Sequence, residues 1–318
     1  MKYYWAMKKV WVYLLDYQRK HFDWKLYVTI LLFVACCIAV NYRLDFEDSI
    51  IDSYHGRPIK WLWMFLFHAF PFVSVCFILY AFGKERSWLS SGNFWLKIFI
   101  GFGLLAFDRS FYGFRIWLAD VPRLELHFIL RCLNWASSLI LVVIPLLIIY
   151  PIIERDDERN WYGLKWKRFD AKPYLFLLLI ASIFIGIGSF LSEINEYYPR
   201  YLKAGANLYL RANPETPEWW LVTIYELSYG SNFISVELIF RGFLIFAFTR
   251  TLGSYAVLPM VATYAFLHFG KPVGETISSV FGGYVLGIIS LNSRNIWGGI
   301  FIHLGVAWLM ELFGWLHR

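Results

Sequence analysis

Long apolar runs alternate with short polar loops along most of the chain. The runs fall at about 24–42, 61–82, 94–107, 124–153, 173–192, 220–249, 255–269, 277–291 and 297–316. A helix of about 20 apolar residues crosses the ~30 Å hydrocarbon core of a bilayer. The runs at 94–107, 255–269 and 277–291 are shorter, so we expect them to be tilted, extended by flanking residues or enclosed by protein. The pattern predicts an all-α, polytopic membrane bundle with about 8–9 transmembrane helices.

The first 23 residues, MKYYWAMKKVWVYLLDYQRKHFD, differ from these runs because they mix five Lys or Arg with aromatic side chains. They lack the continuous apolar core and the small-residue cleavage site of a signal peptide. Amphipathic segments of this kind lie along the membrane surface. We therefore expect an interfacial helix that leads into the first span.

Two loops are polar enough to lie outside the bilayer. The loop at 154–172 carries six Lys or Arg, whereas the loop at 193–218 carries three basic and four acidic residues. The positive-inside rule places the first loop in the cytoplasm and the second on the other side. With nine spans, the same parity puts the N-terminus in the cytoplasm, together with the loops near Lys84, Arg250 and Arg294.

The composition agrees with a protein that lies in lipid. Of its 318 residues, 59% are hydrophobic, 21% are aromatic and only 17% are charged, whereas soluble domains carry about a quarter charged residues. The formal net charge of +7 is spread over many short loops, and scattered basic residues orient a membrane protein against anionic lipid. The charge therefore does not indicate a nucleic-acid partner, and we expect an integral membrane protein whose first partner is membrane lipid.

Ionisable side chains enter the apolar runs in the last third of the chain. They are Glu237, Arg241, His268, Glu275, His303 and Glu311, and they are accompanied by the small-residue clusters FGGYVLG (281–287) and WGG (297–299). Small residues let helices approach closely, and ionisable residues at membrane depth usually mark a functional site. The sequence therefore predicts a supporting part at 1–219 and a functional part at 220–318.

Taken one at a time, these residues have ordinary structural explanations. Glu237 and Arg241 lie at i and i+4 of a helix, and pairing them avoids the cost of an unpaired charge in hydrocarbon without any catalysis. His268 and His303, considered alone, are typical of histidines that only make structural hydrogen bonds.

Together, one carboxylate, one arginine and two histidines indicate chemistry. A carboxylate and an imidazole that face one water are suited to general-base hydrolysis of a peptide bond, and a second imidazole is suited to stabilising the oxyanion. Alternatively, Glu237, His268 and His303 are a ligand set for a divalent metal such as Zn²⁺, which lowers the pKa of its bound water. The spacing does not decide between these alternatives.

The order and spacing of these residues resemble the CPBP family, which contains the CAAX prenyl proteases and the bacteriocin-processing (Abi) intramembrane proteases. The family motifs correspond here to VELIFR (236–241), YAFLH (264–268) and HLGVA (303–307), and Gly242 and Phe243 continue the first motif as is common in the family. The resemblance covers about 230–312. It implies a hydrolase with Glu237 and His268 activating water, His303 stabilising the oxyanion, and Arg241, Tyr264 and Glu311 supporting them.

Three positions depart from the family pattern. Val236 replaces the first glutamate of a pair, Tyr264 replaces phenylalanine, and Ala307 replaces the asparagine that helps to bind the oxyanion. Losing a general base costs ~10²–10⁴-fold in rate, and losing an oxyanion donor costs ~10²–10³-fold. Glu237, one residue further along the helix, is the carboxylate that remains; Glu275 and Glu311 are further candidates.

Three functional hypotheses follow from these observations. The first is an intramembrane endopeptidase that cleaves a membrane-associated protein or peptide. The second is a catalytically inactive pseudoprotease that uses the same cavity to hold a membrane-protein partner. The third is a transporter or channel, which the absence of a clear repeat in the sequence disfavours. The run HFGKP…E…SS…GG…LG (268–287) and the run NIWGGIFIH (295–303) resemble a divergent bacterial branch of the family, which implies the bacterial inner membrane.

Overall fold

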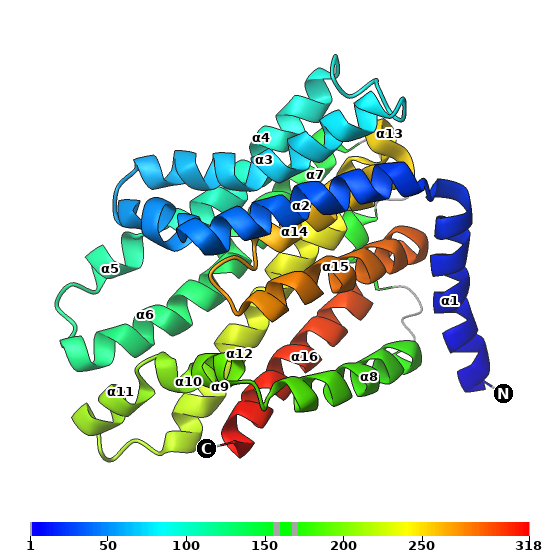
Figure 1. Cartoon of the computed structure of the whole chain (residues 1–318). Coiled ribbons are helices and arrows are strands. Elements are labelled where there is room, and N and C mark those ends of the chain that lie inside the picture. The colour runs from blue at the N-terminus through cyan, green and yellow to red at the C-terminus, as the bar shows by residue number, and fades with distance from the viewer. Residues whose placement is uncertain (1, 155–159, 167–170, 318) are drawn as a thin grey trace.

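The structure is a computed structural model, which describes residues 2–154, 160–166 and 171–317 and the side chains from residue 10 onward. It is a bundle of helices (Figure 1), and no strand occurs within the ranges described. The predicted all-α fold is therefore confirmed. Parts of the basic loop predicted at 154–172 lie outside the described residues, so that loop is described only near its two ends and in the stretch 160–166.

All nine predicted apolar runs are helical, and six helical stretches are long and apolar enough to cross a membrane. These six are α2 (Trp24–Leu44), α3 (Ile59–Ala81), the stretch Arg123–Ile153, the stretch Glu218–Ala247, α15 (Val273–Ser293) and α16 (Trp297–Leu316). The other three runs form α4 (Gly92–Ser110), α8 (Lys172–Gly188) and α14 (Val257–Phe266). The prediction of a helical membrane bundle is confirmed. The total number of spans depends on whether these three further helices also cross the membrane.

Two of the long stretches contain π-helical segments. Helix α6 (Arg123–Ser138) continues through η3 (Leu139–Val143) into α7 (Ile144–Ile153), and α12 (Glu218–Glu237) continues into η5 (Leu238–Ala247). π-Helical turns are rare and are frequent at functional sites. Segment η5 begins immediately after Glu237 and contains Arg241, so the irregular winding falls on the first of the three motifs.

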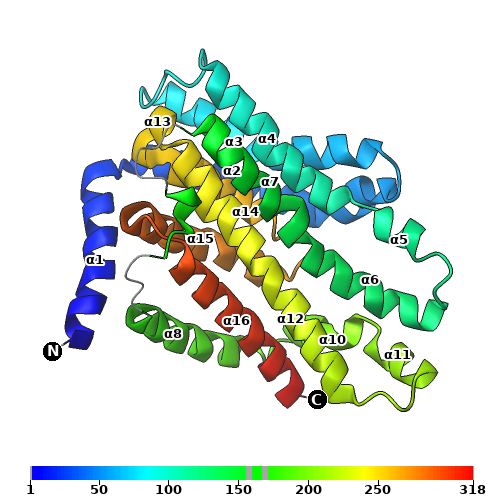
Figure 2. The same cartoon turned by 180° about the vertical axis from the view of Figure 1, so that it is seen from behind.

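The remaining helices lie at the two ends of the bundle. Helix α1 (Lys2–His21) covers one end. Four short helices lie towards the other end: α5 (Gly113–Trp117), α9 (Ser192–Tyr197), α10 (Arg200–Lys203) and α11 (Ala206–Ala212) (Figures 1 and 2). Helix α1 packs on α8 and α15, and the Tyr17 hydroxyl donates a hydrogen bond to the Ser254 carbonyl oxygen at 3.0 Å. This orientation suits the interfacial position predicted for α1, which stays a prediction.

Loops that the charge pattern assigns to one side of the membrane lie at one end of the molecule. Lys84 forms an ion pair of 3.2 Å with Asp23, which precedes α2. The Ile296 N–H, just before α16, donates to the Gly163 carbonyl oxygen at 3.2 Å. The grouping agrees with the predicted topology, and which end is cytoplasmic stays a prediction.

The core of the bundle is formed by η5 and α14. Every residue of α14 is buried, and so is all of η5 except Phe246. Helix α14 has 10 residues, which gives it a length of about 15 Å, half of what a bilayer core requires. Because α3 and α15 pack against it, α14 is surrounded by protein, and this explains how so short an apolar helix lies inside the bundle.

Candidate active site

Glu237, the last residue of α12, lies at the centre of a group of polar side chains. Its side chain is 0% exposed. Its Oε1 lies 3.0 Å from Nδ1 of His303 on α16 and 3.1 Å from Nη1 of Arg241 on η5. Its Oε2 has no hydrogen-bond partner among the described residues. The carboxylate therefore contacts a neighbouring helix as well as its own i+4 arginine.

The contact with Glu237 fixes the proton positions on His303. An ionised carboxylate only accepts hydrogen bonds, so Nδ1 of His303 is the nitrogen that carries a hydrogen and donates it. In the neutral ring Nε2 is then the acceptor, and it lies 3.2 Å from the Tyr264 hydroxyl. The Tyr264 O–H donates to it. Glu237, His303 and Tyr264 thus form one hydrogen-bonded chain across α12, α16 and α14.

Arg241 is held by charge and by an aromatic ring. Its guanidinium carbon lies 3.9 Å from the centre of the Tyr264 ring, a cation–π arrangement. Its Nη1 is close to Glu237, but none of its side-chain nitrogens has a well-aligned hydrogen bond within the described part of the chain. Arg241 therefore neutralises Glu237 while its N–H groups keep the capacity to donate.

His268 lies in the turn that follows α14. Its Nδ1 is 2.9 Å from the Tyr264 carbonyl oxygen, and because a carbonyl oxygen only accepts, Nδ1 carries the hydrogen. Its own carbonyl oxygen accepts the Thr276 hydroxyl at 2.7 Å. Nε2 of His268 therefore keeps a free lone pair. The bond to the Tyr264 carbonyl oxygen orients the ring, and the bond from Thr276 holds the backbone of His268.

One cavity brings the two histidines to a common surface. It has a volume of about 420 Å³. Arg241, Tyr264, His268 and His303 line it together with apolar residues of α8 and α16. Glu237 is fully buried behind His303 and is in contact with it. The arrangement places two imidazoles, a phenol and a guanidinium on the wall of a partly apolar cavity, with a carboxylate directly behind.

Gly299 explains why the WGG cluster accompanies this site. A Cβ atom at Gly299 would lie 2.0 Å from Oε2 and 2.9 Å from Cδ of Glu237. Real Cβ atoms do not approach other atoms so closely, so only glycine allows the start of α16 to lie against the carboxylate. In the same way Gly283 lets α15 approach the Tyr264 ring, whose Cδ1 would lie 3.0 Å from an added Cβ.

The predicted metal ligands do not fit a metal ion as they are arranged. Among the described residues, the group of three or more candidate ligands whose ligand atoms all lie within 4.8 Å of one another is Glu47, Asp48 and Asp52. Glu237, His268 and His303 do not form such a group. A tetrahedral zinc site needs ligand atoms about 2.0–2.2 Å from one ion. The three side chains do not meet this requirement in their present arrangement.

The structure also places the positions that depart from the family pattern. Val236 lines a second, narrow cavity of about 80 Å³ together with His268 and His303, and Ala307 lines the larger cavity. Both substituted positions therefore face the histidines. The site lacks the carboxylate and the amide that the family pattern would supply there.

The two other candidate carboxylates have structural partners. Glu311 accepts the backbone N–H groups of Arg200 at 2.7 Å and Tyr201 at 3.2 Å, at the start of α10. Glu275 pairs with Lys271 at 2.5 Å and accepts the Tyr198 hydroxyl at 3.1 Å on the wall of the larger cavity. Glu311 thus fastens the loop 193–218 to the last helix.

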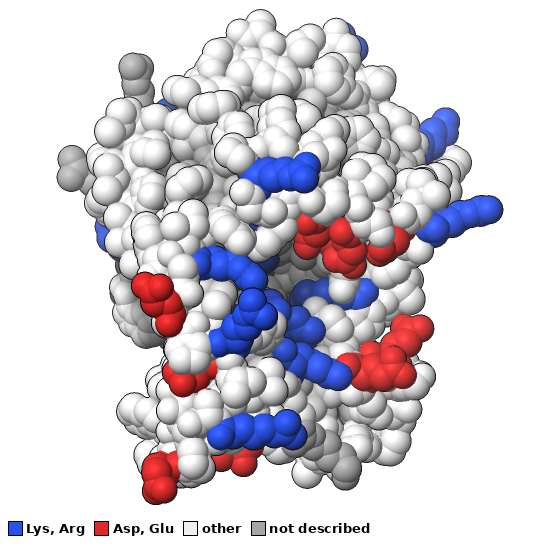
Figure 3. Space-filling model, turned by 90° about the vertical axis from the view of Figure 1, so that its left-hand side faces the viewer, with Lys and Arg blue, Asp and Glu red and all other residues white. Residues whose placement is uncertain are grey.

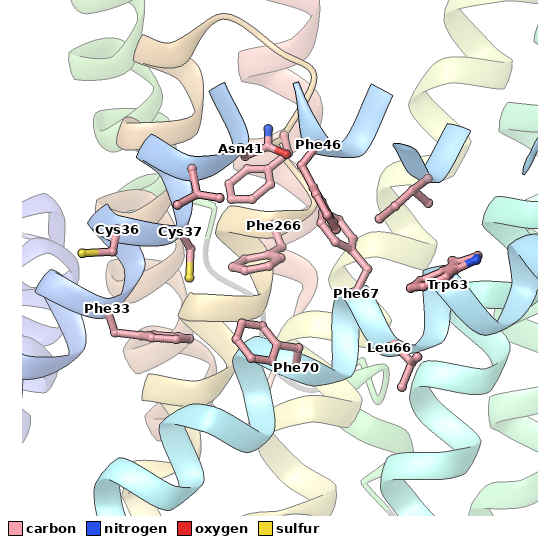
Figure 4. Close-up of a pocket in the computed structure, with 13 residues that line it drawn as sticks. Phe33, Cys36, Cys37, Asn41, Phe46, Trp63, Leu66, Phe67, Phe70 and Phe266 are labelled. Carbon is pink, nitrogen blue, oxygen red and sulfur yellow. The ribbon is translucent and has the colours of Figure 1, made fainter. Parts of the chain in front are cut away.

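A third cavity of about 450 Å³ is almost wholly apolar. It lies between α2, α3, the π-helical segment η1 (Phe46–Ile51) and the end of α14. The rings of Phe33, Phe67, Phe70 and Phe266 gather around it (Figure 4). It contains nothing suited to hydrolysis, so it is not part of the candidate site.

Sequence reasoning missed the basic side chains near the histidines. Arg109, Arg200 and Lys271 line the narrow cavity together with His268 and His303. Arg109 is the second-last residue of α4 and Arg200 is the first residue of α10, far from the three motifs along the chain. No spacing rule connects these two arginines with the motifs, so the sequence held no signal for them, whereas Lys271 follows His268 by three residues.

The comparisons with known proteins agree with the geometry. Residues 217–309 match the family model described as Rce1-like, type II CAAX prenyl endopeptidase. This region contains Glu237, Arg241, Tyr264, His268 and His303, and it covers less than a third of the chain. The match confirms the predicted resemblance to the CPBP family. Searches of curated proteins and of solved structures gave no match.

Proposed function

We propose that this protein is an intramembrane endopeptidase of the CPBP type, which hydrolyses a peptide bond in a membrane-associated protein or peptide. One observation carries the proposal: His268 and the Glu237-supported His303 line the same cavity, inside the region that matches the Rce1-like model. Proton acceptors and donors gathered on one cavity wall are what hydrolysis of a peptide bond requires.

His268 is the general base in this proposal. Its Nδ1 hydrogen is committed to the Tyr264 carbonyl oxygen, so Nε2 carries a free lone pair towards the cavity. A water molecule that donates to Nε2 becomes a stronger nucleophile as its proton moves to the ring. The same proton then serves the leaving amine, which must gain one when the peptide bond breaks.

Glu237 acts through His303 rather than directly on water. The sequence suggested that Glu237 and His268 activate water together, whereas the contact at 3.0 Å favours a carboxylate that supports His303. An imidazole backed by a carboxylate is stabilised when it carries a positive charge. Once the ring has taken up a second proton from solvent, it donates from Nε2, directly or through the Tyr264 hydroxyl, to the carbonyl oxygen that becomes negative. Arg241 lies 3.1 Å from the same carboxylate oxygen and offsets its negative charge.

The setting of the reaction follows from the fold. The cavity is lined by residues of α8, α12, α14, α15 and α16, so a substrate has to be associated with the membrane to reach it. The bacterial inner membrane and a cytoplasmic N-terminus remain part of the proposal. The charge pattern of the loops supports the cytoplasmic N-terminus. The resemblance of 268–287 and 295–303 to a divergent bacterial branch of the family supports the bacterial inner membrane.

The proposal is tested with the full chain in lipid nanodiscs, incubated with a library of membrane-associated peptides and analysed by mass spectrometry. His268→Ala and Glu237→Gln should each lower cleavage by at least about 10²-fold. An exposed control, Glu193→Gln, should cleave at the wild-type rate. Thermal unfolding shows whether each variant is folded. Cleavage that is unchanged in folded His268→Ala would refute the assignment.

A pseudoprotease is the second candidate, and the neighbours of the histidines favour it. Val236 and Ala307 face the cavities where the family pattern has a carboxylate and an amide. An inactive protein would retain a membrane-protein partner in the cavity and would co-purify with it. Turnover that depends on His268 separates the two candidates, because a binding protein would show none.

A further inference from the structure

The narrow cavity of about 80 Å³ connects the histidines to a basic surface. Its inner wall contains Val236, His268 and His303, and Arg109, Arg200 and Lys271 also line it. We call the latter three the basic vestibule. His268, His303 and Lys271 also line the larger cavity, so the two cavities meet at the histidines. Figure 3 shows Lys and Arg side chains around a hollow on the side of the molecule where α5, α6 and α11 lie in Figure 1.

The acids next to the basic vestibule are already engaged. Asp108, beside Arg109, accepts the Ser138 hydroxyl at 2.8 Å. Glu311, near Arg200, accepts two backbone N–H groups. Glu275 neutralises Lys271 at 2.5 Å. Asp108 and Glu311 are close enough to attract Arg109 and Arg200, yet within the described part of the chain neither guanidinium lies at ion-pair distance from a carboxylate.

Further contacts leave the two arginines available. The Nε of Arg109 is buried and has no hydrogen-bond partner among the described residues. The Arg200 guanidinium lies over the Tyr197 ring at 4.1 Å, which holds it without using its N–H groups. Arg131 lies close enough to Arg200 for their charges to repel.

We infer that the basic vestibule binds an acidic side chain of the peptide substrate, which directs substrates with Asp or Glu beside the scissile bond to the histidines. This inference rests on the proposed function. Arginine pairs with carboxylates through two parallel hydrogen bonds, which gives strength and orientation. A carboxylate fits in about 80 Å³, a volume close to that of two or three waters.

Arg109 and Arg200 both lie outside the residues that match the Rce1-like model. The matched region thus supplies the histidines, while the part of the chain before residue 217 supplies the charges next to them. Selection of the substrate and its hydrolysis are in this way assigned to different parts of the chain.

A binding experiment tests the inference without requiring turnover. The full-length His268→Ala variant, in nanodiscs of zwitterionic lipid, is titrated with fluorescent apolar peptides that carry Asp-Asp, Asn-Asn or Lys-Lys at one end. The Asp-Asp peptide should bind at least about 10-fold more tightly than the Asn-Asn peptide, as expected for charge-assisted hydrogen bonds to arginine. The Lys-Lys peptide should bind most weakly.

The second variant replaces both arginines. In the Arg109→Gln/Arg200→Gln protein, also carrying His268→Ala, the preference for Asp-Asp should disappear while Asn-Asn binding is retained, which shows that the protein is folded. The exposed Arg211→Gln control on α11 should keep the preference. Equal binding of the peptides by the starting protein, or a preference that survives in the double variant, would overturn the inference. So would loss of the preference on changing to anionic lipid, because lipid phosphate would then be the ligand.

The outcome is separable from that of the proposed function. Binding of Asp-Asp peptides without any cleavage would support the basic vestibule and contradict the protease assignment. Cleavage of peptides regardless of their charge would support the protease assignment and contradict the basic vestibule.

Discussion

Gly299→Ala should disable the site by adding a single methyl group. The new Cβ would lie 2.0 Å from Oε2 of Glu237, so the carboxylate or the start of α16 must move by about 1.4 Å before the distance reaches the 3.4 Å of an ordinary contact. Glu237 cannot move by that amount and keep both its 3.0 Å contact with His303 and its 3.1 Å contact with Arg241. A misplacement of about 1 Å costs about 10²-fold in rate, and overpacking a buried site costs about 1–3 kcal/mol of stability.

The assay combines thermal unfolding in nanodiscs with cleavage of whichever peptide the wild-type protein hydrolyses. Gly92→Ala is the matched control, because nothing lies within 4 Å of a Cβ added at that helical position. Alanine is favoured over glycine in helices, so the control should be at least as stable as the wild type and equally active. Gly299→Ala should be less stable and about 10²-fold slower.

A double-variant cycle tests whether the methyl group acts through Glu237. In a Glu237→Ala background the space next to residue 299 is open, so adding Gly299→Ala should cost little further activity. Residues in contact give strongly non-additive effects, whereas independent sites add. Two results would refute the role of Gly299 in making room for the Glu237 carboxylate. One is a double variant whose loss of activity equals the product of the two single losses. The other is a Gly299→Ala protein as active as Gly92→Ala.

Three further predictions follow from other residues of the site and its surroundings. Val236→Glu places a carboxylate in the narrow cavity with His268 and His303 and should raise peptide cleavage by about 10-fold or more, at some loss of thermal stability; a folded variant with unchanged turnover would contradict this. Glu311→Gln should lower the free energy of unfolding by about 1–3 kcal/mol, because charge-assisted bonds to two backbone N–H groups are weakened. Its kcat should stay at the wild-type value, and a loss of kcat without a loss of stability would contradict the structural role. Because the pKa of Glu47 is raised to about 8 in the folded protein, the folded state holds this proton more tightly than the unfolded state, so its contribution to stability is present at low pH and is lost as the pH rises through about 8. Melting curves of Glu47→Gln should therefore show a shallower loss of stability between pH 6 and pH 9 than the wild type, and parallel curves would exclude this role of Glu47.

The fold class and the motif helices could be predicted from the sequence, because hydrocarbon imposes simple rules. Runs of apolar residues have to form helices in lipid, since every backbone N–H and C=O must be satisfied internally. For the same reason the i, i+4 spacing of Glu237 and Arg241 predicted their pairing, which the structure contains at 3.1 Å. Local geometry was therefore sufficient for the contacts within one helix.

Contacts between helices could not be predicted in the same way. The partner of Glu237 on another helix is His303, and choosing it over His268 depends on how η5 winds and how closely Gly299 lets α16 approach. The sequence indicated that Tyr264 replaces the family's phenylalanine and supports the site, but not that its hydroxyl lies 3.2 Å from His303. Arg109 and Arg200 come from helix ends whose positions depend on the whole bundle.

The contacts of Glu237 also bear on how the protein is made. Glu237 and Arg241 lie on one continuous helical stretch, so the two charges enter the bilayer together, and each lowers the cost of about 2.5–3.5 kcal/mol that the other would meet at the membrane centre. His303 follows only on α16, the last helix. During synthesis the chain therefore first carries the paired Glu237 and Arg241 without His303. Under the proposed mechanism, the imidazole that Glu237 supports is added only when almost every other helix has been made, so the partly made chain lacks a complete site.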